Sequence, residues 1–219
     1  VNNARTILLR GTRENRSREE GKIIEKLKQL VDKIWQAEDL DQLRGYEGLA
    51  GKKYYQVFSN LLPDEFSFSR RTRRPPKDEA NALLSFGYML LYSEVFNIVN
   101  MVGYDPYIGY LHHDKYGKPS LVLDLMEEFR AIIDNLVKRI INRGVINKDE
   151  FKEKYGGFEL KESSLELFLK KFEQKMSSKF THPQFDYEVD FRETIELQAR
   201  LLSKKLTGEV KDYNPFEVK

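Results

Sequence analysis

Three acidic residues with helical spacing lie in the segment LVLDLMEEFR. Asp124, Glu127 and Glu128 occupy positions i, i+3 and i+4, so a helix that begins near Ser120 would carry their side chains on one face. Grouped carboxylates of this kind can bind a divalent cation. Acids in the first turns of a helix also complement its dipole, and that structural interpretation needs no ligand. The cluster alone leaves both interpretations open.

Two adjacent histidines, His112 and His113, lie just upstream of these acids, in a chain with three histidines in all. A histidine pair in a turn is more often solvated or satisfied within the core than a metal ligand. A loop histidine that leads directly into a helix with carboxylates is nevertheless a compact nitrogen and oxygen donor set. Such a set suits Mg²⁺ or Mn²⁺.

A third acidic position, Glu47, lies between Gly45 and Gly48, where we expect the start of a second helix. A glutamate in a first turn needs no special reason. If folding brought it beside the histidine and the other acids, it would complete a mixed site with open positions for water and phosphate oxygens. Two carboxylates and one imidazole are too few for a closed structural site, so the chemistry implied is catalysis.

A basic strip lies between these segments, in the sequence FSFSRRTRRPPK. Four guanidinium groups fall within five positions, and Pro75-Pro76 follows them, which favours a loop or an extended segment. A guanidinium group can bind a phosphate through two parallel hydrogen bonds, so the strip suits a DNA backbone. A solvated loop is the alternative. The four residues are Arg70, Arg71, Arg73 and Arg74.

The composition permits a folded chain and excludes several classes of protein. The 219 residues are 40% hydrophobic and 12% aromatic, which is enough for a core. The absence of Cys excludes disulfides and thiolate metal sites and fits a reducing compartment. No apolar run approaches the roughly 18 residues of a membrane span, and no signal peptide is recognised at the start. The net charge is only +2, so partners must be inferred from where the charges lie.

Apolar periodicity predicts a mainly α protein, with one helical domain of about six helices and little or no sheet. A long, mostly apolar helix over 79–102 is expected at its centre, between Asp78 as N-cap and Gly103. We expect a strand pair, if any, around Ile146 and residues 158–160, and irregular segments at 11–16 and 208–219. The other expected helices cover Ser17 to Trp35, Gly51 to Leu62, Ser120 to Asn142, Ser163 to Met176 and Tyr187 to Leu206.

Several sequence segments, in the same order along the chain, resemble motifs of one known family. They are YEGLAGKKYY, RRTRRPPKDEANALLSFGYMLLYSEV, GYDPYIGYLHHDKYGKPSLVLDLMEEFR and the late ELQARLL with Y.PF. The chain resembles the CRISPR-associated integrases (Cas one) over nearly its whole length. The resemblance implies a helical catalytic C-terminal domain. The family's N-terminal β domain has no counterpart here, and the chain begins without Met, so we expect a fragment or a processed piece.

The resemblance also implies a site. Glu47, His112 and Glu127 match the family's metal ligands for Mg²⁺ or Mn²⁺, and Asp124 matches a further acidic catalytic residue beside the metal. His113 has no place in the motif. Arg70, Arg71, Arg73 and Arg74 resemble a basic stretch near the DNA. Asn81 and Tyr88 match the family's helix motif, where packing and DNA contact are not separated.

The implied reaction is metal-assisted attack of a spacer DNA 3′-hydroxyl on a phosphodiester of a CRISPR repeat. The expected partners are double-stranded DNA (spacer precursor and repeat), a second copy in the full-length protein and the companion adaptation protein Cas two. No membrane is expected, and the expected location is cytoplasmic. The alternatives are a transposon-borne integrase of the same fold, a non-catalytic helical DNA-binding subunit, and a helical domain whose His and acids are structural.

Overall fold

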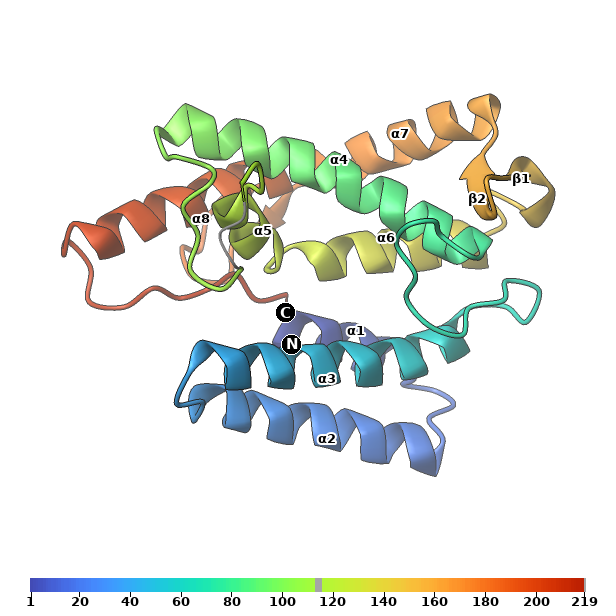
Figure 1. The fold of residues 1–219 in the computed structure, drawn as a ribbon, viewed down its shortest axis with the longest axis horizontal. Helices are drawn as coiled ribbons and strands as arrows, with labels where there is room; N and C mark the ends of the chain where they lie inside the picture. Colours follow the sequence, from blue (N-terminus) through green and yellow to red (C-terminus); the bar gives the residue numbers. More distant parts are fainter. Residues whose placement is uncertain (113–115, 219) are drawn as a thin grey trace. The chain divides into compact units, whose positions relative to one another are not determined.

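The computed structural model describes residues 1–112 and 116–218, so His113 lies outside the described residues. The described chain is mainly α, as predicted, with two short antiparallel hairpins (Figure 1). Its α-helices are α1 (Asn2–Gly11), α2 (Arg18–Trp35), α3 (Leu40–Phe58), α4 (Glu79–Val102), α5 (Ser120–Met126), α6 (Arg130–Asn142), α7 (Glu162–Met176) and α8 (Phe191–Leu206). The shorter elements are η1 (Ser59–Leu61), η2 (Lys148–Glu150), β1 (Phe151–Lys154), β2 (Gly157–Leu160), β3 (Phe180–Thr181) and β4 (Glu188–Val189).

The helix count exceeds the expected number for two reasons. The sequence pattern did not predict α1, and it predicted one continuous helix over 120–142, which the structure divides into α5 and α6. The predicted strand at 158–160 is confirmed as part of β2, but its partner β1 begins at Phe151 rather than around Ile146, and Phe151 pairs with Leu160. The segments 12–16 and 208–218 are irregular, whereas Gly11, which was expected to be irregular, is the last residue of α1.

The start of α3 also differs from the expectation. The helix begins at Leu40 rather than near Gly51, because the Asp39 side chain accepts a hydrogen bond from Gln42 N at 2.7 Å and caps it. Each glycine inside a helix costs about 1 kcal/mol relative to alanine, so the three glycines had suggested a later start. Glu47 consequently lies well inside a regular helix, not at its first turn.

The chain divides into two compact units, and α4, α6 and α7 each contribute residues to both. The first unit contains Val1–Ser85 and Val137–Glu166, and the second contains Phe86–Leu136 and Leu167–Lys219. The expectation of one helical domain spanning residues 1–219 stays a prediction.

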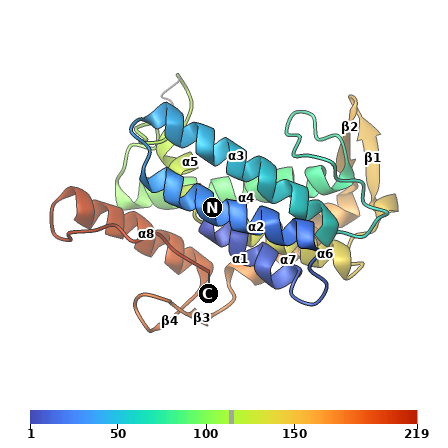
Figure 2. The same cartoon turned by 90° about the horizontal axis from the view of Figure 1, so that it is seen from below.

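Within the first unit, α1, α2 and α3 lie side by side (Figures 1 and 2). The predicted capping box of α2 is confirmed: Ser17 Oγ accepts from Glu20 N, and the Glu20 carboxylate accepts from Ser17 N. Leu8, Leu27 and Phe58, one from each helix, are at most 1% exposed. For α2, the apolar spacing therefore identified the buried face, to which Leu27 belongs.

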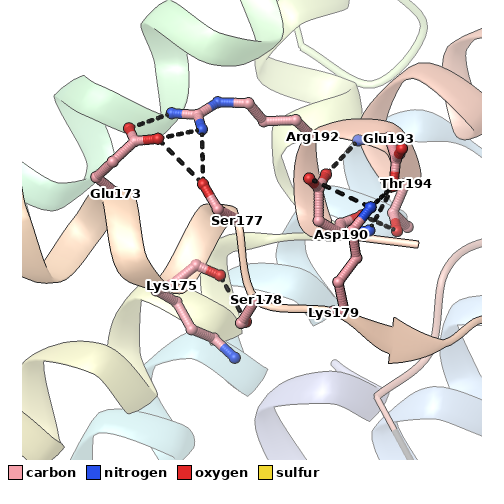
Figure 3. Close-up of polar contacts among 9 residues, drawn as sticks. All are labelled: Glu173, Lys175, Ser177, Ser178, Lys179, Asp190, Arg192, Glu193 and Thr194. Carbon is pink, nitrogen blue, oxygen red and sulfur yellow. Dashed lines mark hydrogen bonds and ion pairs between the residues drawn. The ribbon is translucent and has the colours of Figure 1, made fainter. Parts of the chain in front are cut away.

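Within the second unit, Arg192 near the start of α8 links two other helices. Its guanidinium lies 2.6 Å from Glu173 of α7, a contact drawn in Figure 3, and 2.7 Å from Glu94 of α4. The hydrogen bond from Arg192 lowers the pKa of Glu173. Beside it, α8 begins with a capping box in which Asp190 and Glu193 bond each other's backbone amides (Figure 3). These contacts fix the connection between α7 and α8.

The predicted long helix is confirmed as α4, and its N-cap is Asp78, whose side chain accepts from Asn81 N at 2.7 Å. Among the described residues, α4 is the one helix long and apolar enough to cross a membrane, judged by length and composition only. Half of its most apolar window is buried inside the molecule. A core helix meets the same criteria, so this is weak evidence for a membrane span.

Candidate functional site

The loop that carries His112 is folded around the carboxylate of Asp124. Asp124 Oδ2 accepts hydrogen bonds from the amides of Tyr110 at 2.6 Å and Leu111 at 2.9 Å. Asp124 Oδ1 accepts one from the amide of His112 at 3.0 Å and lies 2.6 Å from His112 Nδ1. One side chain on α5 therefore sets both the path of the loop and the orientation of the imidazole.

Gly109 allows this loop to approach α5. A Cβ at this position would lie 2.5 Å from Ser120 Cβ and 2.8 Å from Asp124 Oδ2, which is too close for any side chain. Leu121 N, in the first turn of α5, donates to Pro106 O at 3.1 Å. The glycine in the sequence GYLH is thus explained by packing, three residues before the histidine.

The same contacts assign the chemical roles of the His112 ring atoms. Because Nδ1 faces an acceptor-only carboxylate, it carries the proton, and Nε2 of the neutral ring keeps its lone pair. Burial would raise the pKa of Asp124, but the bonds from the His112 ring and the three loop amides outweigh it and lower that pKa. A carboxylate–histidine pair of this kind commonly orients a metal-binding imidazole.

Glu127 lies at the break between α5 and α6, where it is the C-cap residue of α5. Its carboxylate is 2.5 Å from the Nη1 atom of Arg130, and the two side chains are 30% and 19% exposed. The Arg130 guanidinium lies over the Tyr88 ring, 4.7 Å from the centroid, and the Tyr88 hydroxyl donates to buried Asp134. Tyr88 is thus engaged in packing inside the second unit and supports the arginine that holds Glu127.

A continuous helix had predicted that Glu128 lies on the same face as Asp124 and Glu127. The structure shows that it does not. The break after α5 turns its carboxylate toward the C-terminal segment, where it accepts from the Tyr213 hydroxyl and from Phe216 N. Burial raises the pKa of Glu128, and these bonds oppose the shift.

Glu47 belongs to the first unit and has an exposed side chain on α3. A Cβ added at Gly45 or Gly48 would meet nothing within 4 Å, so the helix surface beside Glu47 is open. The two glycines therefore leave space next to the carboxylate.

Asn81 organises the arginine strip from the first turn of α4. It is completely buried, and its amide nitrogen donates to Arg70 O at 2.9 Å and to the Asp78 side chain at 2.6 Å. Its Oδ1 accepts from Thr72 N at 2.9 Å and from Arg71 Nη1 at 2.8 Å. These bonds use the donors and acceptor of the side chain, so Asn81 has a packing role in the loop.

The four arginines of the strip are not equivalent. The Arg71 guanidinium is partly buried and also donates to Ser85 Oγ at 3.0 Å. The Arg70, Arg73 and Arg74 side chains are exposed. The structure thus presents three of the four guanidinium groups at the surface, whereas the fourth supports the loop.

The β1–β2 hairpin holds the proline end of the strip. Phe158 N donates to Pro76 O at 3.0 Å. A Cβ at Gly157 would lie 2.6 Å from Pro75 Cβ and 2.8 Å from Pro76 O, so glycine permits this close approach. The strip is therefore held at both ends within the first unit.

The sequence reasoning missed a second basic surface in the first unit. Arg18, Lys22 and Lys26, spaced four residues apart on α2, line a groove of about 420 Å³ together with Lys53 of α3. One carboxylate, that of Glu19, also lines it. The regular spacing of cations along one helix face could have revealed this surface.

Within residues 1–112 and 116–218, no three His, Asp or Glu side chains are grouped so as to hold a metal ion. The donors in the second unit still suit a hard divalent cation: an oriented imidazole with Nε2 available, and the partly exposed carboxylate of Glu127. Whether Glu47 joins them stays a prediction from the resemblance.

Comparisons with known proteins point to one family. The family model described as CRISPR associated protein Cas1 matches residues 1–174. A CRISPR-associated endonuclease Cas1 from Thermus thermophilus is 41% identical over 196 residues, which are 89% of this chain and 59% of that protein. A CRISPR-associated endonuclease Cas1 from Leptospira interrogans is 38% identical over 224 residues, covering 99% of this chain and 88% of that protein. The chain therefore spans little more than half of the Thermus protein.

Solved structures agree with the family match. A Cas6-RT-Cas1–Cas2 complex contains a chain that is 28% identical, with a TM-score of 0.86, covering all of this chain and 23% of that one. A casposase bound to its integration product is 27% identical, with a TM-score of 0.80, covering 96% of this chain and 58% of that one. On the family match and these likenesses, the chain belongs to the CRISPR-associated Cas1 family.

Proposed function

We propose that this chain is the catalytic portion of a divalent-metal-dependent DNA endonuclease and integrase, which inserts spacer DNA into CRISPR arrays. The observation that carries the proposal is the pairing of His112 with Asp124, three residues before Glu127 on the α5–α6 segment. It supplies an imidazole with a fixed tautomer and an available Nε2 atom. Relatives named CRISPR-associated endonuclease Cas1 support the activity class.

In this proposal Glu47, His112 and Glu127 hold Mg²⁺ or Mn²⁺. When bound, such an ion polarises a phosphoryl group and offsets the charge on its oxygens. Asp124 keeps the His112 proton on Nδ1 and presents Nε2, and Arg130 orients the Glu127 carboxylate. The residues of the chain thus bind and orient, and none forms a covalent bond to DNA.

The proposed reaction exchanges one phosphodiester for another. The 3′-hydroxyl oxygen of the spacer attacks a phosphorus atom of the repeat, and the bond from that phosphorus to the repeat's 3′-oxygen breaks. The attacking hydroxyl loses its proton to solvent, and the departing oxygen gains one. The number of phosphodiester bonds is unchanged, so no external energy source is needed. Water in place of the hydroxyl gives endonuclease cleavage.

Duplex DNA, both spacer precursor and CRISPR repeat, is the proposed partner of the exposed guanidinium groups of Arg70, Arg73 and Arg74, since these cations can neutralise phosphates. The groove lined by Lys22 and Lys26 would add to this surface. We propose a homodimer, assembly with Cas2, a cytoplasmic location and no membrane attachment.

A transposon-type integrase is the second candidate. The likeness to a casposase bound to its integration product favours it, because the same phosphoryl chemistry would serve mobile-element ends. The two candidates differ in the DNA they select: an integrase of CRISPR arrays would prefer repeat-containing targets over transposon ends.

The test compares Mn²⁺-dependent strand joining and cleavage of labelled DNA by the unsubstituted chain, His112→Ala and Glu127→Gln. Glu127→Gln keeps a hydrogen-bond acceptor for Arg130 while it removes the charge. Each variant should lose more activity than the roughly 10–100-fold expected for an outer-shell residue. Retained activity in either variant would remove that residue from the ligand set.

Glu166→Ala is the matched control, since it removes an exposed carboxylate from α7. It should leave both reactions unchanged. Calorimetric Mn²⁺ titration of the same proteins, without DNA, separates a lost ligand from a lost DNA contact. If the unsubstituted chain neither binds Mn²⁺ nor acts on DNA, the proposed function is wrong.

A further inference from the structure

The late sequence segments ELQARLL and Y.PF converge on one carboxylate, that of Glu128. Its Oε2 atom accepts hydrogen bonds from Gln198 Nε2 at 2.8 Å and from Phe216 N at 2.7 Å. Its Oε1 atom accepts one from the Tyr213 hydroxyl. All three partners are donors, which suits an ionised carboxylate. The segments are separated in sequence but share this acceptor.

Phe129, the residue after Glu128, also contacts the segment 212–217, through an aromatic ring. The Phe216 ring stacks on Phe129, with centroids 5.5 Å apart and planes 9° apart, and it is 3% exposed. Phe180 and Phe191 approach the same ring at 5.9 and 6.2 Å. Burying a phenylalanine side chain removes apolar surface from water, so the segment 212–217 (the tail) is held by apolar as well as polar contacts.

Further hydrogen bonds hold the backbone between Tyr213 and Phe216. Gln184 Nε2 donates to Asn214 O and to Pro215 O, each at 3.1 Å, and Gln198 Nε2 also reaches Asn214 O at 3.1 Å. The segment 212–217 has no regular secondary structure. It is nevertheless held by contacts at four consecutive residues, 213–216.

The point of attachment is the helix break that carries Glu127. Glu128 and Phe129 are the two residues between Glu127 and Arg130, and neither belongs to α5 or α6. The break is formed by short turns, in which Glu128 N donates to Leu125 O at 3.3 Å and Phe129 N donates to Met126 O at 3.0 Å. Nothing in the local sequence ends a helix here, since LDLMEEFR contains neither glycine nor proline.

We propose that the segment 212–217, together with Gln198, is a positioning element that sets the break and thereby aims the Glu127 carboxylate. The inference rests on the proposed function, in which Glu127 binds the metal. Arg130, the first residue of α6, forms an ion pair with the Glu127 carboxylate. The tail binds the next residue, Glu128, and so fixes the backbone beside Glu127. Residues about ninety positions later in the chain thus act on the site through Glu128 and Phe129.

The experiment uses Phe216→Ala and Glu128→Gln in the full chain, with Lys211→Ala, an exposed position outside the anchored segment, as control. Calorimetric titration of Mn²⁺ without DNA should give about 10-fold weaker binding for both variants, the scale of an outer-shell effect, and no change for the control. Half-maximal strand cleavage should need correspondingly more Mn²⁺, with a nearly normal rate at saturation. A merely structural role would reduce the amount of folded protein without this shift.

Hydrogen exchange provides a readout that needs no metal. Amides of residues 127–130 should exchange about 10-fold faster in Phe216→Ala, while those in α2 keep their rates. If the variants bind Mn²⁺ as tightly as the unsubstituted chain, or if exchange at the break is unchanged, the tail does not position Glu127. His112→Ala, titrated in parallel, separates this result from a failure of the proposed function. That failure would appear as equal Mn²⁺ binding by His112→Ala and the unsubstituted chain.

Discussion

Two regions supply carboxylates to the proposed site, and they hold them differently. Glu47 lies inside α3, a regular helix of 19 residues whose backbone hydrogen bonds are made within the helix, and its side chain is exposed. Asp124 accepts hydrogen bonds from three consecutive loop amides and from the ring of His112. The backbone of α3 is hydrogen-bonded without the Glu47 carboxylate, whereas the Asp124 carboxylate supplies the hydrogen bonds that hold the 110–112 loop.

This difference determines how mutations in the two regions should be interpreted. Removing a side chain from the surface of a regular helix leaves the backbone hydrogen bonds of the helix satisfied. Removing an acceptor of backbone amides leaves donors unsatisfied and disturbs the loop as well. A loss of activity at Asp124 therefore has two explanations, a lost chemical group and a disturbed loop, and stability measurements separate them.

The largest combined effect is expected for Asp124→Ala. Four donors lose their acceptor, and since the loop is partly exposed we expect the free energy of unfolding to fall by about 2–4 kcal/mol. The imidazole loses its orienting partner, which should weaken Mn²⁺ binding by about 10–100-fold. Urea denaturation measures the first effect and calorimetric titration the second.

Glu47→Ala is the matched variant for this comparison. Its free energy of unfolding should stay within about 0.5 kcal/mol of the unsubstituted value, while Mn²⁺-dependent activity is lost. A destabilisation as large as that of Asp124→Ala would show that the two carboxylates are held alike. Full activity would remove Glu47 from the proposed ligand set.

Asn81→Ala extends the comparison to the arginine strip. The substitution removes a buried side chain that ties Arg70, Arg71, Thr72 and Asp78, and we expect a loss of about 2–3 kcal/mol in the free energy of unfolding. DNA affinity at low salt should fall as well, because the exposed arginines lose a fixed backbone. Urea denaturation and fluorescence anisotropy measure these effects.

Ser85→Ala is the control for that experiment. It removes only the hydroxyl that accepts from Arg71, and the expected loss is roughly 0.5–1.5 kcal/mol. Equal losses in the two variants would mean that Asn81 does not organise the loop.

Local signals in the sequence predicted the regular elements well. The Ser17 and Glu20 capping box, the Asp78 cap and the end of α4 at Gly103, whose φ is +92°, depend on neighbouring residues alone. Apolar spacing likewise identified the buried faces of the long helices. These features are set within one or two turns, so a single sequence contains the necessary information.

Two of the features that were missed depend on residues distant in the sequence. The periodicity of residues 120–142 continues through the break, which is held by Glu128 and Phe129 contacts with Phe216. Arg71 is less exposed than the other three arginines because its guanidinium is hydrogen-bonded to Asn81, ten positions later. Chemical type identified the candidate residues, but whether a side chain binds a ligand or supports the fold is decided by such contacts.

A smaller effect is expected when single exposed arginines of the strip are replaced. Each phosphate contact contributes about 0.9 to the slope of log K against log salt, so Arg73→Gln should reduce the slope by about that amount. Arg71→Gln should instead lower stability with little change in slope, because its guanidinium is bonded within the loop. Anisotropy titrations at several salt concentrations measure the slopes. An equal slope change for both would contradict the distinction.

The smallest effect concerns His182, which contrasts with His112 as a histidine held by burial. It is 1% exposed, its Nδ1 accepts from Gln184 N at 3.2 Å, and its ring stacks on Phe185 at 4.6 Å. Burial lowers the pKa of His182. Below the ordinary histidine pKa of about 6.5, the unfolded chain then binds more protons than the folded one, so stability falls as the pH falls.

Between pH 7.5 and pH 5.5, we expect this group to reduce the free energy of unfolding as the pH falls. His182→Asn keeps an acceptor for Gln184 N but does not titrate, so the variant should lose that part of the pH dependence. The measurement compares urea midpoints of the variant and the unsubstituted chain at the two pH values, which cancels the contributions of the other titrating groups. Identical pH dependence in both proteins would show that His182 is protonated as readily in the folded chain as in the unfolded one, and burial would then not distinguish the two histidines.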